Sequence, residues 1–321
     1  MRALVTGAAG FIGSTLSQRL ATDGHQVVAL DSLTAYYDEA QKRENLDEVA
    51  RTPGCTTMIE DLRTADLSSL LEGIDVVFHQ AGQPGVRASW DAGFAAYVEQ
   101  NVLVTQRLLE AAKGSSLRRF VFASSSSVYG DARRYPTVED DLPTPVSPYG
   151  VTKLAAEHLA VVYARNFGVP TVSLRYFTVY GPRQRPDMAM HRLFEAAIDG
   201  RPFPMYGDGT QIRDFTFVDD VVAANIAAAE SDCPAGLVVN VCGGGSTTLL
   251  EVTGIVSEVI GRDVGLDRLP AQPGDVFRTG GSGERARDVI GWEPRVTVPE
   301  GLRRQGAWHL ARRERAAPAS Q

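Results

Sequence analysis

Three glycines near the N-terminus set the strongest constraint on the fold of this chain. Gly7, Gly10 and Gly13 form the pattern G-x-x-G-x-x-G between an apolar strand and the start of a helix. Glycines at this spacing let the chain turn tightly and let a pyrophosphate approach the N-terminus of the helix. Asp31 ends the next strand, where a carboxylate can accept both hydroxyls of an adenosine ribose and repel a 2′-phosphate. The sequence therefore predicts a dinucleotide site that prefers NAD to NADP, with an ordinary glycine-rich turn as the alternative.

The order of apolar segments predicts an α/β fold. Each expected strand is a nearly continuous apolar run, which is typical of parallel strands covered by helices on both faces. We expect strands over residues 2–7, 25–31, 55–62, 74–82, 118–126 and 170–177, and helices over 11–24, 95–113 and 148–167. After Phe177 the chain becomes irregular and rich in Pro and Gly, although a helix over 217–230 and a strand over 237–244 should rejoin the sheet. These features predict a Rossmann-type doubly wound parallel sheet with a smaller C-terminal lobe of loops and short elements.

Composition narrows the class of protein. The 321 residues carry 32 basic and 39 acidic side chains, a net charge of -7, which gives no bulk attraction to nucleic acid or to an anionic membrane. Cys55, Cys233 and Cys242 are odd in number and widely spaced, so we expect neither a disulfide framework nor a metal site. We expect no signal peptide and no membrane span, and predict a cytoplasmic protein.

Tyr149 and Lys153 form a second pattern with chemical meaning. Residues four positions apart lie on one face of a helix. A tyrosine pKa of about 10 is too high for a base at pH 7, but a neighbouring ammonium and a positive nicotinamide ring favour the phenolate. Tyr149 could then take a proton from a substrate hydroxyl while the same carbon loses a hydride to NAD. The alternative is the face of an ordinary amphipathic helix.

Six segments together resemble the extended short-chain dehydrogenase/reductase enzymes that act on nucleotide sugars. They are TGAAGFIG, HQAGQPGVR, ASSSSVYG, YGVTK, RYFTVYGPRQRPDM and RDFTFVDD, and the resemblance covers nearly the whole chain. It implies an NAD-binding Rossmann domain over residues 1–175, with a return of 215–243. It also implies a UDP-sugar-binding lobe built from 176–214 and 244–321.

The resemblance assigns roles to individual residues. The catalytic residues that it implies are Ser125, Tyr149 and Lys153. The cofactor contacts that it implies are Gly7, Gly10, Phe11, Ile12, Gly13, Asp31, Asp61, Leu62, Gln80, Ala81, Gly82, Asn101, Tyr149, Lys153 and Tyr176. The substrate contacts that it implies are Arg87, Ser125, Ser126, Tyr149, Phe177, Thr178, Arg185, Met188, Tyr206, Arg213 and Asp275. For Asp61, a hydrogen bond to the adenine amino group and a helix-capping role both stay open.

Four consecutive serines, residues 124–127, bear on the type of reaction. Related 4,6-dehydratases carry an Asp-Glu pair in place of Ser126 and Ser127, because dehydration needs an acid and a base. Related decarboxylases carry a glutamate just before Val-Tyr-Gly. This chain offers only hydroxyls there, which orient a substrate but do not exchange protons usefully at pH 7. The serines therefore favour an epimerase, which oxidises and re-reduces one carbon, and the alternative is a polar loop after a strand.

The segments 31–46 and 178–220 are most similar to UDP-glucuronate 4-epimerases. That resemblance implies NAD-dependent conversion of UDP-glucuronate to UDP-galacturonate. Arg185 and Thr178 then become candidates for holding the C6 carboxylate through charge-assisted hydrogen bonds, and Arg87 is a weaker candidate.

Two further assignments concern the other end of the substrate. Arg213 would meet the pyrophosphate and Asp275 the uridine ribose. The alternatives are a UDP-glucose 4-epimerase, a UDP-glucuronate decarboxylase and a non-catalytic NAD-sensing regulator, which would have no reason to keep Tyr149 with Lys153. The resemblance also implies a homodimer formed through the helices expected at 95–113 and 148–167.

Overall fold

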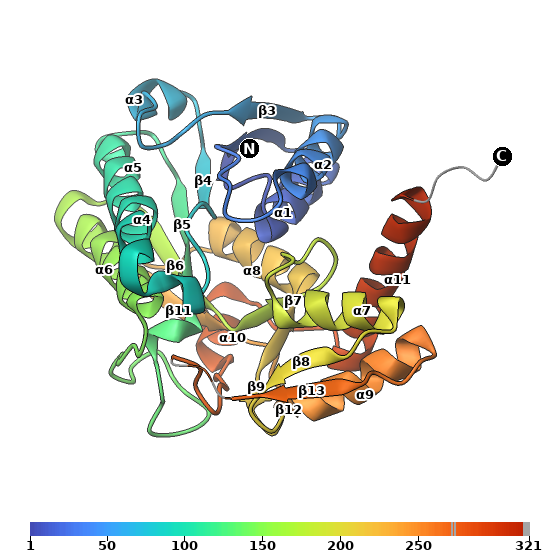
Figure 1. Ribbon diagram of the computed structural model, residues 1–321. Helices are drawn as coiled ribbons and strands as arrows, with labels where there is room; N and C mark the ends of the chain where they lie inside the picture. The colour runs from blue at the N-terminus through green and yellow to red at the C-terminus, as the bar shows by residue number, and fades with distance from the viewer. Residues whose placement is uncertain (271, 273, 317–321) are drawn as a thin grey trace.

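A seven-stranded parallel sheet forms the centre of the computed structural model, which describes residues 1–270, 272 and 274–316 (Figure 1). Its strands are β1 (Arg2–Thr6), β2 (Gln26–Asp31), β3 (Cys55–Ile59), β4 (Val76–His79), β5 (Arg119–Ser125), β6 (Thr171–Tyr176) and β11 (Leu237–Val241). They are arranged in the order β11-β6-β5-β4-β1-β2-β3. The strand order reverses between β1 and β4, and ligands of such sheets bind at the carboxyl ends of the strands beside this switch point.

Helices cover both faces of the sheet, as its apolar strands require. One face is covered by α1 (Phe11–Thr22), α2 (Glu39–Ala50) and α8 (Val218–Glu230), and the other by α3 (Leu67–Leu70), α5 (Val104–Ala112) and α6 (Pro148–Phe167). Successive residues of β1 pack against opposite helix layers. Val5 packs with α1 and α8, whereas Leu4 packs with α5 and α6. The predicted doubly wound α/β fold is confirmed, and α8 and β11 rejoin the sheet as predicted.

The segment predicted as one helix over 95–113 contains an irregular turn. It consists of α4 (Phe94–Tyr97), the π-helical stretch η3 (Val98–Leu103) and α5. Asn101 is buried within η3. Its side chain accepts a hydrogen bond from the Gln83 backbone N–H at 2.7 Å and donates one to Thr152 Oγ1 at 3.0 Å. Single π turns are frequent at functional sites, and this one links the loop after β4 to α6.

The chain after β6 contains more helix than we predicted. The helices there, besides α8, are α7 (Ala189–Asp199), α9 (Leu249–Ile260), α10 (Glu284–Ile290) and α11 (Val298–Ala316). Three short strand pairs accompany them: β7 (Thr178–Tyr180) with β10 (Phe215–Phe217), β8 (Phe203–Tyr206) with β13 (Leu266–Leu269), and β9 (Ile212–Arg213) with β12 (Thr247–Thr248). The prediction of loops and short elements was therefore wrong for α7, α9 and α11, whereas α10 and the strand pairs are short elements. Gly200, Gly261 and Gly291 adopt the left-handed conformation at three helix ends, so glycines that suggested loops are C-terminal caps.

Three further predictions concern membrane-spanning helices, the oligomeric state and the domain boundaries. Within the described ranges, no helix is both long enough and apolar enough to cross a membrane. The predicted homodimer stays a prediction, because the structure contains one chain. The predicted domain boundaries also stay a prediction.

Candidate active site

The turn between β1 and α1 has the geometry that a dinucleotide requires. Gly7 adopts the left-handed conformation (φ 71°), and a Cβ there would lie 2.8 Å from the Ala81 backbone nitrogen. A Cβ on Gly13 would lie 2.1 Å from the Gly7 carbonyl oxygen, so α1 can pack against the turn only with glycine at this position. A Cβ on Gly10 would meet only that oxygen, at 3.0 Å, and Gly10 borders an open cavity. These glycines leave room for a pyrophosphate at the N-terminus of α1.

Asp31 places its carboxylate beside this turn. Its Oδ2 accepts the Ala9 N–H at 3.0 Å and its Oδ1 accepts the Leu33 N–H at 2.8 Å. The two bonds fix the carboxylate, and each oxygen keeps a lone pair for a ribose hydroxyl. Asp61 lies in the same cavity wall, where it pairs with Arg63 (Oδ2 to Nη2, 2.7 Å). The hydrogen bond from Arg63 lowers the pKa of Asp61, so an adenine amino group would have to share this carboxylate with an arginine.

A cavity runs along the carboxyl ends of β1, β2, β4, β5 and β6. The predicted cofactor contacts that line it are Gly7, Gly10, Phe11, Ile12, Gly13, Asp31, Asp61, Leu62, Gln80, Ala81, Gly82, Tyr149, Lys153 and Tyr176. Asn101 is next to this wall, since a Cβ on Gly82 would come within 2.8 Å of Asn101 Oδ1. Other residues that line the cavity were not predicted, among them Thr34, Tyr36, Tyr37, Lys42, Pro84 and Gln100. In the sequence, the two consecutive tyrosines after β2 could have indicated the part of the cavity wall near Asp31.

The three predicted catalytic residues meet at this cavity. Ser125 ends β5 next to the lining residue Ser124, Tyr149 lies in the first turn of α6, and Lys153 follows one turn later. The Lys153 Nζ donates a hydrogen bond to the Ala123 carbonyl at 2.8 Å. Burial lowers the pKa of Lys153 to about 8, so the ammonium form still predominates at pH 7.

The environment of Tyr149 differs from the predicted one in the source of positive charge. Burial raises the pKa of the phenol, whereas the Ser125 hydroxyl and the Arg185 guanidinium lower it. Lys153 was the predicted cation beside Tyr149, and the structure adds Arg185, which lies between β7 and α7 and lines the same cavity. The residue predicted to hold a substrate carboxylate therefore also lies close enough to act on the predicted base.

The other predicted substrate contacts lie outside the lining of this cavity. Ser126, Phe177, Thr178 and Met188 follow β5 and β6 or precede α7. Arg87 pairs with Asp275 (Nη2 to Oδ2, 2.6 Å), and its guanidinium lies 4.1 Å from the centre of the Tyr206 ring. Arg213 donates to the Val276 carbonyl at 2.7 Å; burial lowers the pKa of Arg213, and the Asp275 charge opposes this shift. Arg87 thus lies beside Asp275, which was predicted to contact the uridine ribose. It does not belong to the cavity lining that contains Arg185.

A buried polar network behind the serine run was not predicted. Arg175 of β6 pairs with Glu157 of α6 (Nη2 to Oε1, 2.6 Å). Glu157 Oε2 also accepts the Ser124 hydroxyl at 2.6 Å. The Tyr129 hydroxyl accepts a hydrogen bond from Arg175 Nη1 at 2.7 Å and donates one to Asn240 Oδ1 at 2.7 Å. Through Ser124 and Tyr129, the network links the serine segment to β6 and β11. In the sequence, Arg175 indicated such a network, because it is a charged residue within a buried strand.

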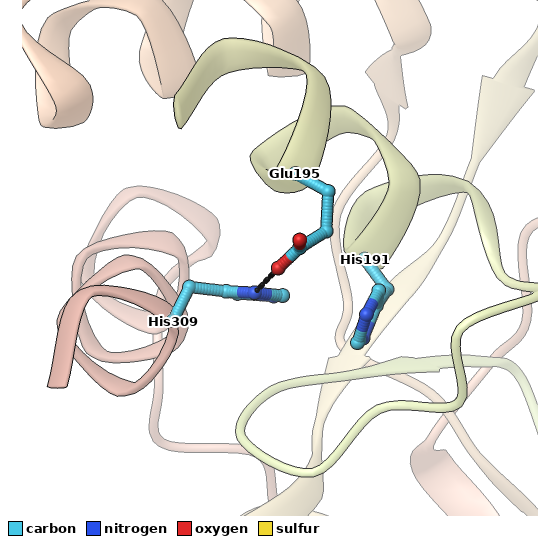
Figure 2. Close-up of side chains that lie close together, drawn as sticks. All are labelled: His191, Glu195 and His309. Atoms are coloured by element: carbon cyan, nitrogen blue, oxygen red, sulfur yellow. Dashed lines mark hydrogen bonds and ion pairs between the residues drawn. The ribbon is translucent and has the colours of Figure 1, made fainter. Parts of the chain in front are cut away.

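Two histidines and a glutamate lie together where α11 packs on α7 (Figure 2). Their possible metal-ligand atoms lie within 4.8 Å of one another. Glu195 Oε1 bonds His309 Nδ1 at 2.9 Å, and Glu195 also pairs with Arg313. His191 Nδ1 donates to the Gln184 carbonyl at 2.7 Å. Each residue has one protein partner and the group joins α7 to α11, whereas His309 Nε2 is buried without a hydrogen-bond partner among the described residues.

Known proteins resemble this chain over almost its whole length. The model of the NAD dependent epimerase/dehydratase family matches residues 3–242. YtcB of Bacillus subtilis (strain 168), named an uncharacterized UDP-glucose epimerase, is 41% identical over 309 residues, which cover 96% of this chain and 98% of YtcB. A probable UDP-glucuronate 4-epimerase of Rhizobium meliloti (strain 1021) is 37% identical over 331 residues, with 96% and 97% covered. The crystal structure of UDP-glucuronic acid 4-epimerase from Bacillus cereus in complex with UDP-glucuronic acid and NAD matches with a TM-score of 0.94 and 42% identity, covering 97% of this chain and 99% of that chain.

Proposed function

The chain belongs to the NAD dependent epimerase/dehydratase family, and we propose that it interconverts UDP-glucuronate and UDP-galacturonate through a 4-keto intermediate, with NAD as cofactor. The glycine turn and the fixed Asp31 carboxylate support the choice of cofactor. The resemblance to UDP-glucuronate 4-epimerases and the position of Arg185 support the choice of sugar.

One observation carries the proposal: Tyr149, Lys153 and Arg185 line the same cavity as the glycine turn. A phenol is a suitable base for a sugar hydroxyl, and a guanidinium matches the geometry of a carboxylate. The chain segment beside Tyr149 offers the hydroxyls of Ser125 and Ser126 and no carboxyl group that could remove water from the sugar. The set therefore suits oxidation and reduction of one carbon in an acidic sugar.

NAD would supply the hydride acceptor and donor for C4 of the sugar. Tyr149 takes the proton from the C4 hydroxyl, and the Ser125 hydroxyl donates a hydrogen bond to the C4 oxygen. Lys153, held by the Ala123 carbonyl, keeps a positive charge one helical turn from Tyr149. Arg213 anchors the diphosphate while the 4-keto sugar turns about its bond to the diphosphate and presents its other face. Tyr149 then returns the proton to the C4 oxygen, which completes the inversion at C4.

The 4-keto form of glucuronate is a β-keto acid. It loses CO2 when the C5–C6 bond, which joins the carboxylate to the ring, aligns with the ketone π system. A carboxylate held near the plane of the sugar ring is not aligned in this way. We assign this restraint to Arg185 and Thr178, which would both hold the carboxylate through charge-assisted hydrogen bonds. The restraint explains how an epimerase could avoid decarboxylation without any change in Tyr149.

A UDP-glucose 4-epimerase is the second candidate. Arg185 already pairs with Asp187 (Nη2 to Oδ2, 2.9 Å), so a neutral sugar would not face an unpaired cation. The 41% identity to YtcB is also consistent with this candidate.

The test is an assay of the purified protein with UDP-glucuronate and with UDP-glucose at several concentrations. Products are identified by chromatography and NMR, and CO2 and UDP-pentose are measured in the same reactions. We expect UDP-galacturonate as the main product, little UDP-pentose, and a higher kcat/KM for the acid. A higher kcat/KM for UDP-glucose would favour the second candidate, and UDP-pentose as the main product would indicate a decarboxylase.

A further inference from the structure

The Arg185 guanidinium is held along one edge by Asp187. Its Nε donates to Asp187 Oδ1 and its Nη2 to Asp187 Oδ2, both at 2.9 Å. Such a two-bond fork fixes the plane of the guanidinium as well as its position. The Arg185 side chain is 18% exposed and that of Asp187 is 37% exposed, so the pair lies at the border between the cavity and the surface.

The two residues of the pair differ in their relation to the cavity. Arg185 lines the cavity, whereas Asp187 does not. A guanidinium has five N–H donors and can bind a carboxylate along either of two edges. Asp187 occupies the Nε/Nη2 edge, and no hydrogen bond from Nη1 to another described residue is present. The Nη1/Nη2 edge therefore remains available for a second carboxylate.

The backbone of this turn is fixed independently of Asp187. The Gln184 carbonyl accepts His191 Nδ1 at 2.7 Å, and Gln184 Oε1 accepts Gln305 Nε2 at 2.9 Å. The Arg185 carbonyl accepts the Met188 N–H at 3.1 Å. These bonds hold the main chain on both sides of Arg185 but do not orient its side chain. The guanidinium lies 5.9 Å from the centre of the Tyr36 ring, and its hydrogen bonds to other side chains go to Asp187.

We propose that Asp187 is a positioning residue for sugar specificity: it holds the Nε/Nη2 edge of Arg185 so that the Nη1/Nη2 edge binds the C6 carboxylate of the substrate. This inference rests on the proposed function. Asp187 also balances the Arg185 charge when the site holds no acid, because an isolated cation in a largely buried site is unfavourable. When the acidic sugar binds, the guanidinium lies between two carboxylates and stays in one orientation.

The experiment compares Asp187→Ala, Asp187→Asn and Arg185→Ala with the wild type, and uses the exposed Asp263→Ala as a matched control. For each variant we would measure kcat and KM with UDP-glucuronate, the share of UDP-pentose among the products, and the affinities for UDP and UDP-glucose. Thermal unfolding of each variant reports its folding.

We expect Asp187→Ala to lower kcat with UDP-glucuronate on the order of 10-fold, since a misplacement of about 1 Å in a substrate-holding group can cost up to about 100-fold. The UDP-pentose share should rise, because the loosened guanidinium lets C6 leave the plane of the sugar ring and the C5–C6 bond align with the ketone π system. The affinity for UDP should stay at the wild-type level, whereas UDP-glucose should bind more weakly, because its neutral sugar would face the unpaired Arg185 cation. Asp187→Asn should be intermediate, because its amide oxygen can accept from Nε but its NH2 group cannot accept from Nη2.

Three results would overturn the inference while leaving the proposed function intact. They are an unchanged kcat and UDP-pentose share in Asp187→Ala, an increase in acid turnover, and an equal loss of affinity for UDP and UDP-glucose. The last result would assign Asp187 a general structural role. Failure of the proposed function would give other results: the wild type would not epimerise UDP-glucuronate, or Arg185→Ala would turn it over at the wild-type rate. Either result would also remove the basis for the role of Asp187.

Discussion

Glu157→Gln removes the carboxylate that neutralises Arg175 between α6 and β6. The side chains of Arg175 and Glu157 are 5% and 2% exposed, and Arg175 Nε donates a second hydrogen bond to Glu157 Oε2 at 3.0 Å. In the variant, the amide oxygen can replace one acceptor, but the amide NH2 group would face guanidinium donors. Arg175 would then remain buried as an unneutralised cation, and Ser124 would compete with it for the single amide oxygen.

The size of the effect follows from the burial of the pair. Removal of one partner of a buried ion pair costs about 3–5 kcal/mol, because the other charge is left without a counter-ion. Unfolding entropy is about 2.1 cal/mol/K per residue near 60 °C, so the Tm of a chain of 321 residues falls by about 1.5 °C per kcal/mol. We therefore expect the Tm of Glu157→Gln to lie about 4–7 °C below that of the wild type.

The assay is thermal unfolding at one fixed scan rate, followed by circular dichroism. Glu230→Gln, at the exposed end of α8, is the matched control, and its Tm should stay within about 1 °C of the wild type because surface substitutions have small effects. The double variant Glu157→Leu/Arg175→Met replaces the pair by apolar side chains. It should recover most of the lost Tm, because apolar replacement of both partners of a buried pair is often neutral or stabilising.

Two outcomes would refute this reasoning. If Glu157→Gln lowers the Tm no more than the control, Tyr129 and the Glu139 carbonyl, which also contact Arg175, are sufficient partners for the cation. If the double variant is as unstable as the single one, the unneutralised charge is not the cause of the loss.

Four further predictions concern the cofactor, the chemistry and acid stability. Tyr149→Phe should lower kcat at least about 100-fold in the epimerase assay with an unchanged Tm, because it removes the base and keeps the ring. Protein freed of its cofactor and reconstituted with NADP should be much less active than with NAD because of Asp31, and equal rescue by both would contradict that role. Gly13→Ala should abolish NAD binding or folding because its Cβ would lie 2.1 Å from a backbone oxygen, whereas Gly254→Ala, which meets nothing within 4 Å, should unfold at the wild-type Tm or above in a thermal melt. The hydrogen bond from His309 and the Arg313 charge lower the pKa of Glu195 to about 2. The ionised carboxylate therefore stabilises the fold above its usual pKa of 4.5, and this stabilisation is lost as the pH falls toward 2. Glu195→Gln should flatten the dependence of Tm on pH in this range.

The parts of the structure that could be predicted depend on local patterns. The apolar runs of β1, β2, β4 and β5 identify strands because a central parallel strand is buried on both faces. The spacing of Gly7, Gly10 and Gly13 fixes the turn, since a side chain at Gly13 would overlap the backbone. Tyr149 and Lys153 share a helix face because their spacing matches the helical repeat.

The parts that could not be predicted depend on which side chains meet across the fold. Arg175 in the sixth strand shows that a charge is buried, but not that Glu157 neutralises it. Burial raises the pKa of Tyr149, and the Arg185 guanidinium opposes this shift; Arg185 lies 36 residues along the chain, so the sequence could not show that the two residues are close. The helices α7, α9 and α10 were missed because the glycine that caps each of them also signals a loop.

The late position of β11 in the chain affects how the sheet is completed during synthesis. β11 pairs with β6, but about 60 residues lie between the two strands. A ribosome adds roughly 5–20 residues per second, so β6 remains an unpaired edge for roughly 3–12 s after it emerges. Exposed strand edges can pair with other chains, and a charged residue within the strand discourages such pairing. Arg175 lies in this strand, so we expect the charge that is buried in the finished protein to disfavour pairing of β6 with other chains until β11 is synthesised.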